Sequence, residues 1–374
     1  MKIAMLGTRG LPASYSGFET AVENIGSRLV VRGHEVTVYC RPHMVKGRYD
    51  RYKGMKLVYI PTIRNKYLDT FVHSLLCTLH MALAVRPDVA LYFIAGNSPF
   101  AGLSRLLGVP SIINVDGLDS QRAKWPAAAK AHLRWAEQSA PRLATRTITD
   151  SRVVQKLYRE SYGADTEFIP YGSSLEGEDT GEYLERFALS PRGYLLFVGR
   201  LVPENNAHVL VEAFAGLRTD LKLVVVGDAS YADDYQRELR ACADEQVVFT
   251  GYLFGDGYRE LLRNAAVVVA ATEVGGTHPV IAEALGAGNC VVVNDHAPNL
   301  EVIGDAGVSY RGADGAVGLR RVLQALLDDP GAVASYRERA AARALAEYSW
   351  DAVTLRYEEL AEAVCVRRQR PPRM

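Results

Sequence analysis

The pattern of apolar and polar positions in the first half of the chain predicts strands that alternate with helices. Short apolar runs, which are typical of buried strands, lie at residues 2–7, 35–40, 56–60, 89–94 and 111–115. Apolar residues at helical spacing predict helices at residues 18–31 and 70–84. Strands that alternate with helices form a parallel sheet with helices on both faces. We therefore expect a doubly wound α/β domain over residues 1–172.

The same pattern starts again after residues 173–190, a polar segment rich in Gly, Glu and Asp that we interpret as a linker. Further apolar runs lie at residues 194–198, 221–226, 247–250, 266–270 and 290–293. They predict a second doubly wound α/β domain over residues 173–349. Residues 350–364 have apolar side chains on one face, and we expect this C-terminal helix, over residues 350–366, to pack on the first domain. We expect the basic tail at residues 367–373 to be disordered.

Composition excludes several classes of protein. At roughly 100–200 residues per domain, 374 residues suggest two domains. The 43 Lys and Arg residues balance 43 Asp and Glu residues, so no net charge attracts the chain to nucleic acid. The five cysteines include no C-x-x-C pair, which argues against a disulfide framework or a zinc ribbon and favours a reducing compartment. No apolar run approaches the ~20 residues of a spanning helix, so we expect no transmembrane segment.

The loop after the first predicted strand carries the first candidate chemistry. It ends in a capping box at residues 16–19, which predicts a helix N-terminus. Its glycines allow backbone amides to approach a ligand, and a helix N-terminus favours anions. Arg9 and Pro12 stand where a dinucleotide fingerprint requires glycine, which argues against hydride transfer. Two alternatives stay open: the loop only turns the chain, and Glu19 only completes the capping box.

Three segments of the second half suit the parts of a nucleotide. Arg200 follows a predicted strand, where open parallel sheets bind ligands, and its guanidinium can meet a phosphate. Residues 275–277, Gly-Gly-Thr, predict a turn whose amides bind an anion. Glu283 lies about two turns into the next helix, and its carboxylate can accept hydrogen bonds from both hydroxyls of a ribose. The alternative for Arg200 is an ion pair at the surface.

Five segments spread over both halves carry a resemblance to a known family. They are residues 15–20, 114–119 with 122–125, 169–172, 200 with 203–206, and 275–277. Over residues 1–350 the chain resembles the retaining, nucleotide-sugar-dependent glycosyltransferases of family 4, and within them the bacterial subgroup that includes rhamnosyltransferases of surface-polysaccharide assembly. The resemblance implies a GT-B fold, in which two doubly wound, Rossmann-like α/β domains face each other across a cleft.

The resemblance also implies which residues bind the two substrates. The nucleotide-sugar donor binds to the second domain and the acceptor to the first. Donor-binding residues are Gly17, Arg200, Asn205, Gly275, Gly276, Thr277, His278 and Glu283. Acceptor-binding residues are Tyr15, Phe18, Glu19, Arg122 and Lys124. Catalytic residues are Asp116, Arg200 and Glu273.

The chain departs from the family pattern at four positions. Asn205 replaces a lysine, so one positive charge near the donor diphosphate is absent. Glu273 and Glu283 lie farther apart than the paired glutamates of the family. His278 stands in place of an asparagine, and Asp116 in place of a histidine. For Asp116, an Asx turn is the alternative to a catalytic role.

The activity that the resemblance implies is a sugar transfer with retention of configuration, without a metal ion or cofactor. The donor is dTDP-rhamnose or a UDP-hexose, and the acceptor is a saccharide linked to a polyprenyl diphosphate, in the synthesis of a cell-surface polysaccharide. Two alternatives use the same fold: a nucleotide-sugar epimerase or isomerase, and a nucleotide-sugar binding protein without catalytic activity. We expect no nucleic-acid partner.

Residues 41–67 are rich in basic and aromatic side chains. The basic ones are Arg41, Lys46, Arg48, Arg51, Lys53, Lys56, Arg64 and Lys66. Basic residues interleaved with tyrosines suit an anionic membrane surface. The predicted helix at residues 70–84 is apolar on more than one face. We therefore expect a cytoplasmic protein that binds peripherally to the inner face of the plasma membrane; the alternative is a core helix beside a solvated loop.

Overall fold

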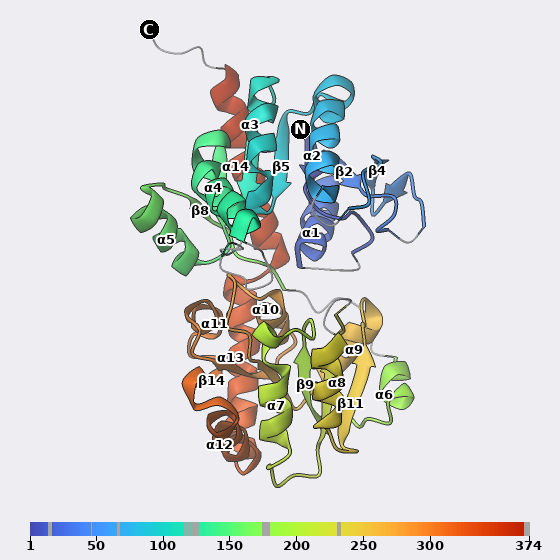
Figure 1. Cartoon of the computed structure of the whole chain (residues 1–374), viewed down its shortest axis with the longest axis vertical. Helices are drawn as coiled ribbons and strands as arrows, with labels where there is room; N and C mark the ends of the chain where they lie inside the picture. The colour runs from blue at the N-terminus through green and yellow to red at the C-terminus, as the bar shows by residue number, and fades with distance from the viewer. Residues whose placement is uncertain are drawn as a thin grey trace. The chain divides into compact units, whose positions relative to one another are not determined.

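The computed structural model describes residues 1–13, 17–45, 47–65, 68–115, 117, 120, 127–173, 180–229 and 233–369. The chain forms two units (Figure 1). The first contains Met1–Tyr171, Gly275–Thr277 and Trp350–Met374, and the second contains Gly172–Val274 and His278–Ser349. The short segment Gly275–Thr277 thus belongs to the first unit although its neighbours along the chain belong to the second.

The first unit is built on an eight-stranded sheet in the order β3-β4-β2-β1-β5-β6-β7-β8. Only the β3–β4 pair is antiparallel among these neighbours. The strands are β1 (Lys2–Leu6), β2 (Glu35–Cys40), β3 (Arg51–Tyr52), β4 (Met55–Tyr59), β5 (Val89–Phe93), β6 (Ser111–Asn114), β7 (Arg146–Thr149) and β8 (Glu167–Phe168). The central strands β1 and β5 are buried on both faces, which explains their uninterrupted apolar sequences.

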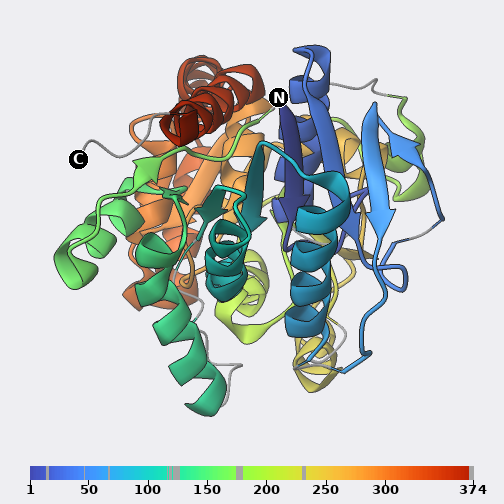
Figure 2. The ribbon, with the colours of Figure 1, turned by 90° about the horizontal axis from the view of Figure 1, so that it is seen from above.

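Helices cover both faces of this sheet. They are α1 (Gly17–Val31), α2 (Asp69–His80) with a π-helical turn over Met81–Val85, α3 (Ser98–Leu106), α4 (Ala127–Leu143), α5 (Arg152–Tyr162) and α14 (Trp350–Gln369). Val22 and Ile25 of α1 share one apolar core with Val353 and Tyr357 of α14. Residues of α2, α3, α4 and α5 pack in the core on the other face. Figure 2 shows α14, in dark red, on the side of the sheet opposite to α2 and α3.

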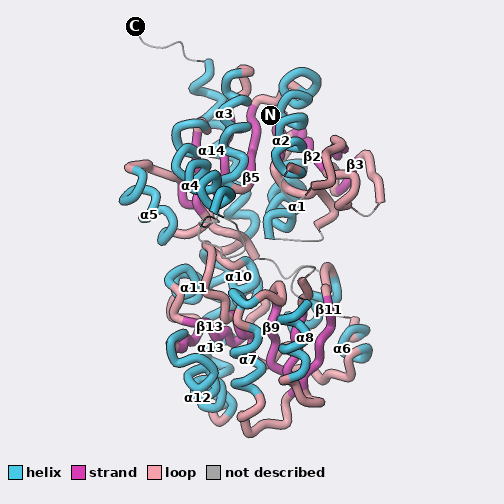
Figure 3. The backbone as a smooth tube through the Cα atoms, in the orientation of Figure 1, coloured by secondary structure: helices cyan, strands magenta, loops and turns pink. Residues whose placement is uncertain are grey.

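The second unit has a six-stranded parallel sheet in the order β11-β10-β9-β12-β13-β14. The strands are β9 (Tyr194–Val198), β10 (Lys222–Val226), β11 (Val247–Gly251), β12 (Val267–Ala270), β13 (Cys290–Asn294) and β14 (Val308–Tyr310). The helices are α6 (Glu182–Arg186), α7 (Ala207–Phe214), α8 (Asp233–Ala241), α9 (Asp256–Asn264), α10 (Pro279–Gly286), α11 (Ala297–Ile303), α12 (Gly315–Leu327) and α13 (Pro330–Glu347). They form apolar cores with both faces of the sheet. Figure 3 shows these helices in cyan and the strands in magenta.

The predicted fold class is confirmed: each unit is an α/β fold built on a parallel sheet, with β3–β4 as the one antiparallel pair among the described strands. Two local predictions are wrong. Residues 182–186 of the predicted linker form α6, because Leu184 is buried in the core of the second unit. The predicted disorder of the basic tail is wrong for residues 367–369, which belong to α14, and residues 370–373 lie outside the described part. Within the described residues, no helix is both long and apolar enough to cross a bilayer.

Candidate functional site

The centre of the second sheet carries the first group of candidate residues. β9 lies between β10 and β12, so the strand order reverses beside it, and ligands of open α/β sheets bind outside the carboxyl ends of the strands at such a point. Gly199 and Gly227 follow β9 and β10. A Cβ atom on Gly227, whose φ is +146°, would lie 1.8 Å from the carbonyl oxygen of Gly199. Only glycine at position 227 allows the two loops to approach so closely.

Arg200 follows this close approach and is half-buried. The side-chain amide of Asn205 donates a hydrogen bond of 2.8 Å to the backbone carbonyl of Arg200. Asn206 adopts a left-handed conformation with φ of 56° and donates from its side chain to the carbonyl of Ala271, at 3.1 Å. The two asparagines therefore hold the Arg200 loop against the end of β12. In the structure, Asn205 supports the backbone beside Arg200.

The segment from Glu273 to His278 is divided between the units. Glu273 is exposed, and its backbone amide donates to the carbonyl of Glu204 at 3.4 Å. In the first unit, the Thr277 hydroxyl donates to the backbone carbonyl of Asp150 at 2.9 Å. A Cβ atom on Gly276 would lie 2.9 Å from Oδ1 of the buried Asp150. The Gly-Gly-Thr sequence thus permits close packing against Asp150. The anion-binding turn that the sequence predicts at these residues stays a prediction.

Glu283 lies on α10 in the second unit, where the Tyr258 hydroxyl of α9 donates a hydrogen bond to its Oε2. Burial raises the pKa of the Glu283 carboxyl, and the hydrogen bond from Tyr258 and the charge of Arg259 offset part of this rise. The half-buried carboxylate suits recognition of a diol, because it accepts hydrogen bonds and donates none when ionised. The sequence analysis did not identify Tyr258, because no local sequence pattern indicates that a tyrosine of α9 contacts Glu283 of α10.

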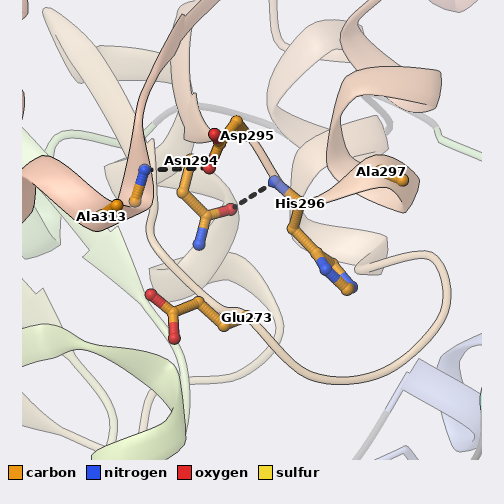
Figure 4. A pocket seen from close by; sticks show the side chains of 7 residues that line it. Glu273, Asn294, Asp295, His296, Ala297 and Ala313 are labelled. Carbon is orange, nitrogen blue, oxygen red and sulfur yellow. Dashed lines mark hydrogen bonds between the residues drawn. The ribbon is translucent and has the colours of Figure 1, made fainter.

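A cavity of about 500 Å³ lies at the carboxyl ends of β12, β13 and β14. It is lined by Glu273, Asn294, Asp295, His296, Ala297, Gly312 and Ala313 (Figure 4). Asp295 Oδ1 accepts a hydrogen bond of 2.9 Å from the backbone amide of Gly312. Of the residues that line this cavity, the sequence analysis identified only Glu273 as a candidate site residue. The rule that identified Arg200 would also have found Asn294 to His296, because these residues follow a predicted strand.

In the first unit, the start of α1 holds the loop after β1. Oε1 of Glu19, which is 3% exposed, accepts a hydrogen bond of 2.9 Å from the backbone amide of Arg9. The ring of Phe18 makes edge contacts with Phe93 and Tyr171, at centroid distances of 6.0 and 6.2 Å. Gly17 begins α1. The other predicted residues of this unit lie outside the described part: Tyr15, Asp116, Arg122 and Lys124.

Arg41 does not belong to the exposed basic surface that its sequence neighbours predict. It is 5% exposed and its Nη1 donates to Asp69 Oδ2 at 2.8 Å, in a buried ion pair. His43 Nε2 lies 3.7 Å from the other oxygen of Asp69. Burial lowers the pKa of the Arg41 guanidinium, and Asp69 opposes that change. The interpretation of Arg41 as a surface cation is therefore wrong, because the start of α2 supplies a buried carboxylate.

Comparison with known proteins identifies the two halves separately. Residues 15–176 match the family described as Glycosyltransferase Family 4, and residues 192–329 match the family described as Glycosyl transferases group 1. The O-antigen chain mannosyltransferase B of Escherichia coli is 29% identical over 180 residues, which are 46% of this chain and 46% of that protein.

A Campylobacter jejuni relative is the N-acetylgalactosamine-N,N'-diacetylbacillosaminyl-diphospho-undecaprenol 4-alpha-N-acetylgalactosaminyltransferase, 28% identical over 46% of this chain and 48% of that protein. The matches to these two relatives thus span about half of their lengths. Among solved structures, Anabaena Alr3699/HepE in complex with UDP-glucose is similar with a TM-score of 0.78 and 17% identity, over 97% of this chain and 100% of that chain.

Proposed function

Because the chain belongs to the group 1, family 4 glycosyltransferases and has the GT-B fold expected from its sequence, we propose that it moves a sugar from a nucleotide diphosphate to a saccharide acceptor. The acceptor in this proposal is part of a growing cell-surface polysaccharide. Relatives that act on O-antigen chains and on a diphospho-undecaprenol saccharide support this choice. The transferred sugar is rhamnose or a hexose, carried by dTDP or UDP.

The observation that carries the proposal is the arrangement of Arg200 and Glu283 in the second unit. Arg200 lies at the carboxyl end of the central strand β9, where its guanidinium can bind the donor diphosphate. The half-buried Glu283 carboxylate would accept hydrogen bonds from the ribose hydroxyls. The amides of Gly275 to Thr277 and the Gly17 loop would bind the remaining phosphate oxygens, with Glu273 toward the donor sugar.

The proposed mechanism retains the configuration of the sugar and uses no metal ion. Negative charge develops on the leaving diphosphate as the glycosidic bond to the nucleotide breaks, and Arg200 with the amides stabilises it. Asp116 orients the acceptor hydroxyl, whose oxygen forms a bond to the anomeric carbon of the sugar while the hydroxyl proton passes to an oxygen of the donor phosphate. Tyr15, Phe18, Glu19, Arg122 and Lys124 of the first unit form the acceptor site. Glu19 also holds the loop that carries this site, through the amide of Arg9.

We extend the proposal to binding at an anionic membrane, as a lipid-linked acceptor requires. Leu76, Leu79 and Leu83 follow one another at spacings of three and four residues along α2 and its π-helical end, and are 39%, 37% and 70% exposed. Exposed cations precede them in the same unit: Arg48, Arg51, Lys56 and Arg64. Apolar side chains near basic ones bind anionic lipid surfaces, and each cation contributes about 1 kcal/mol near the surface.

A liposome assay tests this extension. We expect the wild-type protein to co-sediment with anionic vesicles at low salt, and substitution of Leu76, Leu79 and Leu83 by serine to abolish this binding. Leu106→Ser removes a leucine that is 86% exposed on another helix of the same unit, and it should leave binding unchanged. Equal binding by both variants, or no binding by the wild type, would remove the membrane from the proposal.

Sugar transfer itself is tested with Arg200→Ala. Loss of one preorganised donor to the leaving group should lower turnover by roughly 100- to 1000-fold, with an unchanged melting temperature. Arg218→Ala, which removes an exposed arginine of the same unit, is the matched control. Turnover of the nucleotide sugar to an isomer without any acceptor would favour an epimerase instead, and donor binding without turnover would favour a silent binding protein.

A further inference from the structure

His278 follows the Gly-Gly-Thr turn and precedes α10, and both of its ring nitrogens face hydrogen-bond acceptors. Nδ1 lies 2.8 Å from Asn299 Oδ1, and Nε2 lies 3.2 Å from the backbone carbonyl oxygen of Val274. A carbonyl oxygen can only accept a hydrogen bond. Each ring nitrogen therefore faces an oxygen that can only accept a hydrogen bond from it.

The orientation of Asn299 is set by its own buried surroundings. The side chain is fully buried, and its Nδ2 donates to the carbonyl of Thr272 at 2.9 Å and to Asn294 Oδ1 at 2.7 Å. Asn294 is oriented in turn, because its Nδ2 donates to the carbonyl of Ala271 at 2.9 Å. Since Thr272 and Ala271 present carbonyl oxygens, both amides have only one orientation that satisfies them. Oδ1 of Asn299 must therefore face His278.

A neutral imidazole has one N–H and one bare nitrogen, so it satisfies only one of these two acceptors. The imidazolium cation satisfies both. We propose that His278 is held as an imidazolium by Asn299 and Val274, and that it is the second cation of the donor diphosphate site, where Asn205 leaves the family's lysine position uncharged. This inference rests on the proposed function for its ligand.

The charge acts on the diphosphate through space, because both N–H groups of His278 are already donated within the protein. The hydrogen bond between the His278 ring and the Val274 carbonyl also links the two ends of this segment, and so positions the amides of the Gly-Gly-Thr turn between them. Asn299 is thus a positioning residue that acts through His278. The N-terminus of α10 disfavours a cation in the free protein, whereas a bound diphosphate favours one. Donor binding should therefore increase the protonation of His278, and protonation should strengthen donor binding.

Other titratable groups surround this position. The ring centroid of His296, at the start of α11, lies 6.5 Å from that of His278. Glu273 and Asp295 line the same cavity as His296 (Figure 4). A charged His296 opposes the imidazolium and the two carboxylates favour it. The test must therefore read the protonation of His278 itself.

Nitrogen NMR of the imidazole side chains reads protonation directly in the full chain. The signals of His278 are assigned by their loss in His278→Gln, and are followed between about pH 5 and 9 with and without UDP-glucose or dTDP-rhamnose. We expect both nitrogens to be protonated in the donor complex at neutral pH, and the titration midpoint to rise on addition of the nucleotide sugar. A neutral ring with a proton on Nδ1 alone, in the free protein and the complex at neutral pH, would overturn the proposal.

Donor affinity provides the second readout. The diester diphosphate of a nucleotide sugar does not titrate in this range, so a change in its affinity reports the protein. We expect the dissociation constant to rise about threefold from pH 6 to pH 8, which is the order of the attraction between two unit charges roughly 6 Å apart in a water-like medium. His278→Gln should abolish this dependence, and His208→Gln, a matched control in the same unit, should retain it. The same pH dependence in His278→Gln would contradict the proposal.

The outcomes separate this inference from the proposed function. Tight donor binding with a neutral His278 overturns the inference and leaves sugar transfer intact. If neither nucleotide sugar binds at any pH, the donor site fails and the inferred role of His278 fails with it, whereas the spectrum of the free protein still reports the charge on the ring.

Discussion

The hydrogen bond from Tyr258 to Glu283 should make the stability of the second unit depend on pH. Tyr258→Phe removes the hydroxyl that donates to the half-buried carboxylate of Glu283 and leaves the ring in place. A hydrogen bond to a charged group contributes about 1.5–3 kcal/mol, and one between neutral groups about 0.5–1.5 kcal/mol. The cost of the substitution therefore depends on whether Glu283 is ionised.

The sign follows from the raised pKa of Glu283. Because the folded pKa lies above that of the unfolded chain, the stability that protonated Glu283 contributes at low pH is lost as pH rises through the folded pKa. The hydrogen bond from Tyr258 lowers this pKa, so its removal raises the pKa further and enlarges the loss. We expect Tyr258→Phe to cost about 1 kcal/mol at pH values where Glu283 is protonated and about 2–3 kcal/mol at pH values above its folded pKa.

Scanning calorimetry of the full chain measures the effect. For a unit of this size, about 2–4 °C of melting temperature correspond to 1 kcal/mol, so across a pH series the variant should melt about 2–4 °C lower where Glu283 is protonated and about 4–12 °C lower where it is ionised. In a Glu283→Gln background the effect of Tyr258→Phe should become independent of pH. An equal decrease at every pH of the series in the Glu283 protein would refute the assignment of a half-buried carboxylate that accepts from Tyr258.

Three further predictions concern two other contacts and the metal-free mechanism. Glu358 accepts from Arg32 and His34 at 2.5 and 2.7 Å, and these bonds lower its pKa, so Glu358→Gln should destabilise the first unit by about 1–2 kcal/mol at neutral pH. That cost should shrink as pH falls through the folded pKa of Glu358, as calorimetry can show, with the second unit as internal control. Gly227→Ala should cost several kcal/mol in chemical denaturation, against about 1 kcal/mol for Gly251→Ala, whose φ is +72° but whose side-chain space is open. Sugar transfer should continue in excess EDTA, and its loss on chelation with recovery on magnesium would contradict the metal-free mechanism.

Most strands of both sheets could be predicted because burial on both faces makes their sequences continuously apolar. β9 and β2 have the predicted bounds, whereas β3, β8 and β14, of two or three residues, carry too little pattern to detect, and the polar residues of β7 hide its strand pattern. Arg200 could be placed because its position after a strand is a local property, and the same rule extends to Asn294.

Other features depend on tertiary contacts that local sequence does not encode. The basic stretch predicted Arg41 as a surface cation, but Asp69 lies far along the chain and pairs with it in the interior. The two acceptors of His278 depend on the packing of α11 and on the chain closing back to Val274. The grouping of Gly275–Thr277 with the first unit likewise has no signal in the Gly-Gly-Thr sequence.

Calorimetric titration of a panel of nucleotide sugars into the full-length protein tests the central claim most directly. The account predicts that nucleotide sugars of one base bind in the micromolar to millimolar range, that Arg200→Ala and Glu283→Ala each weaken binding by at least about tenfold, and that Arg218→Ala does not. A folded protein that binds none of them, or that binds them equally well without Arg200 and Glu283, would contradict the assignment of the donor site to the second unit.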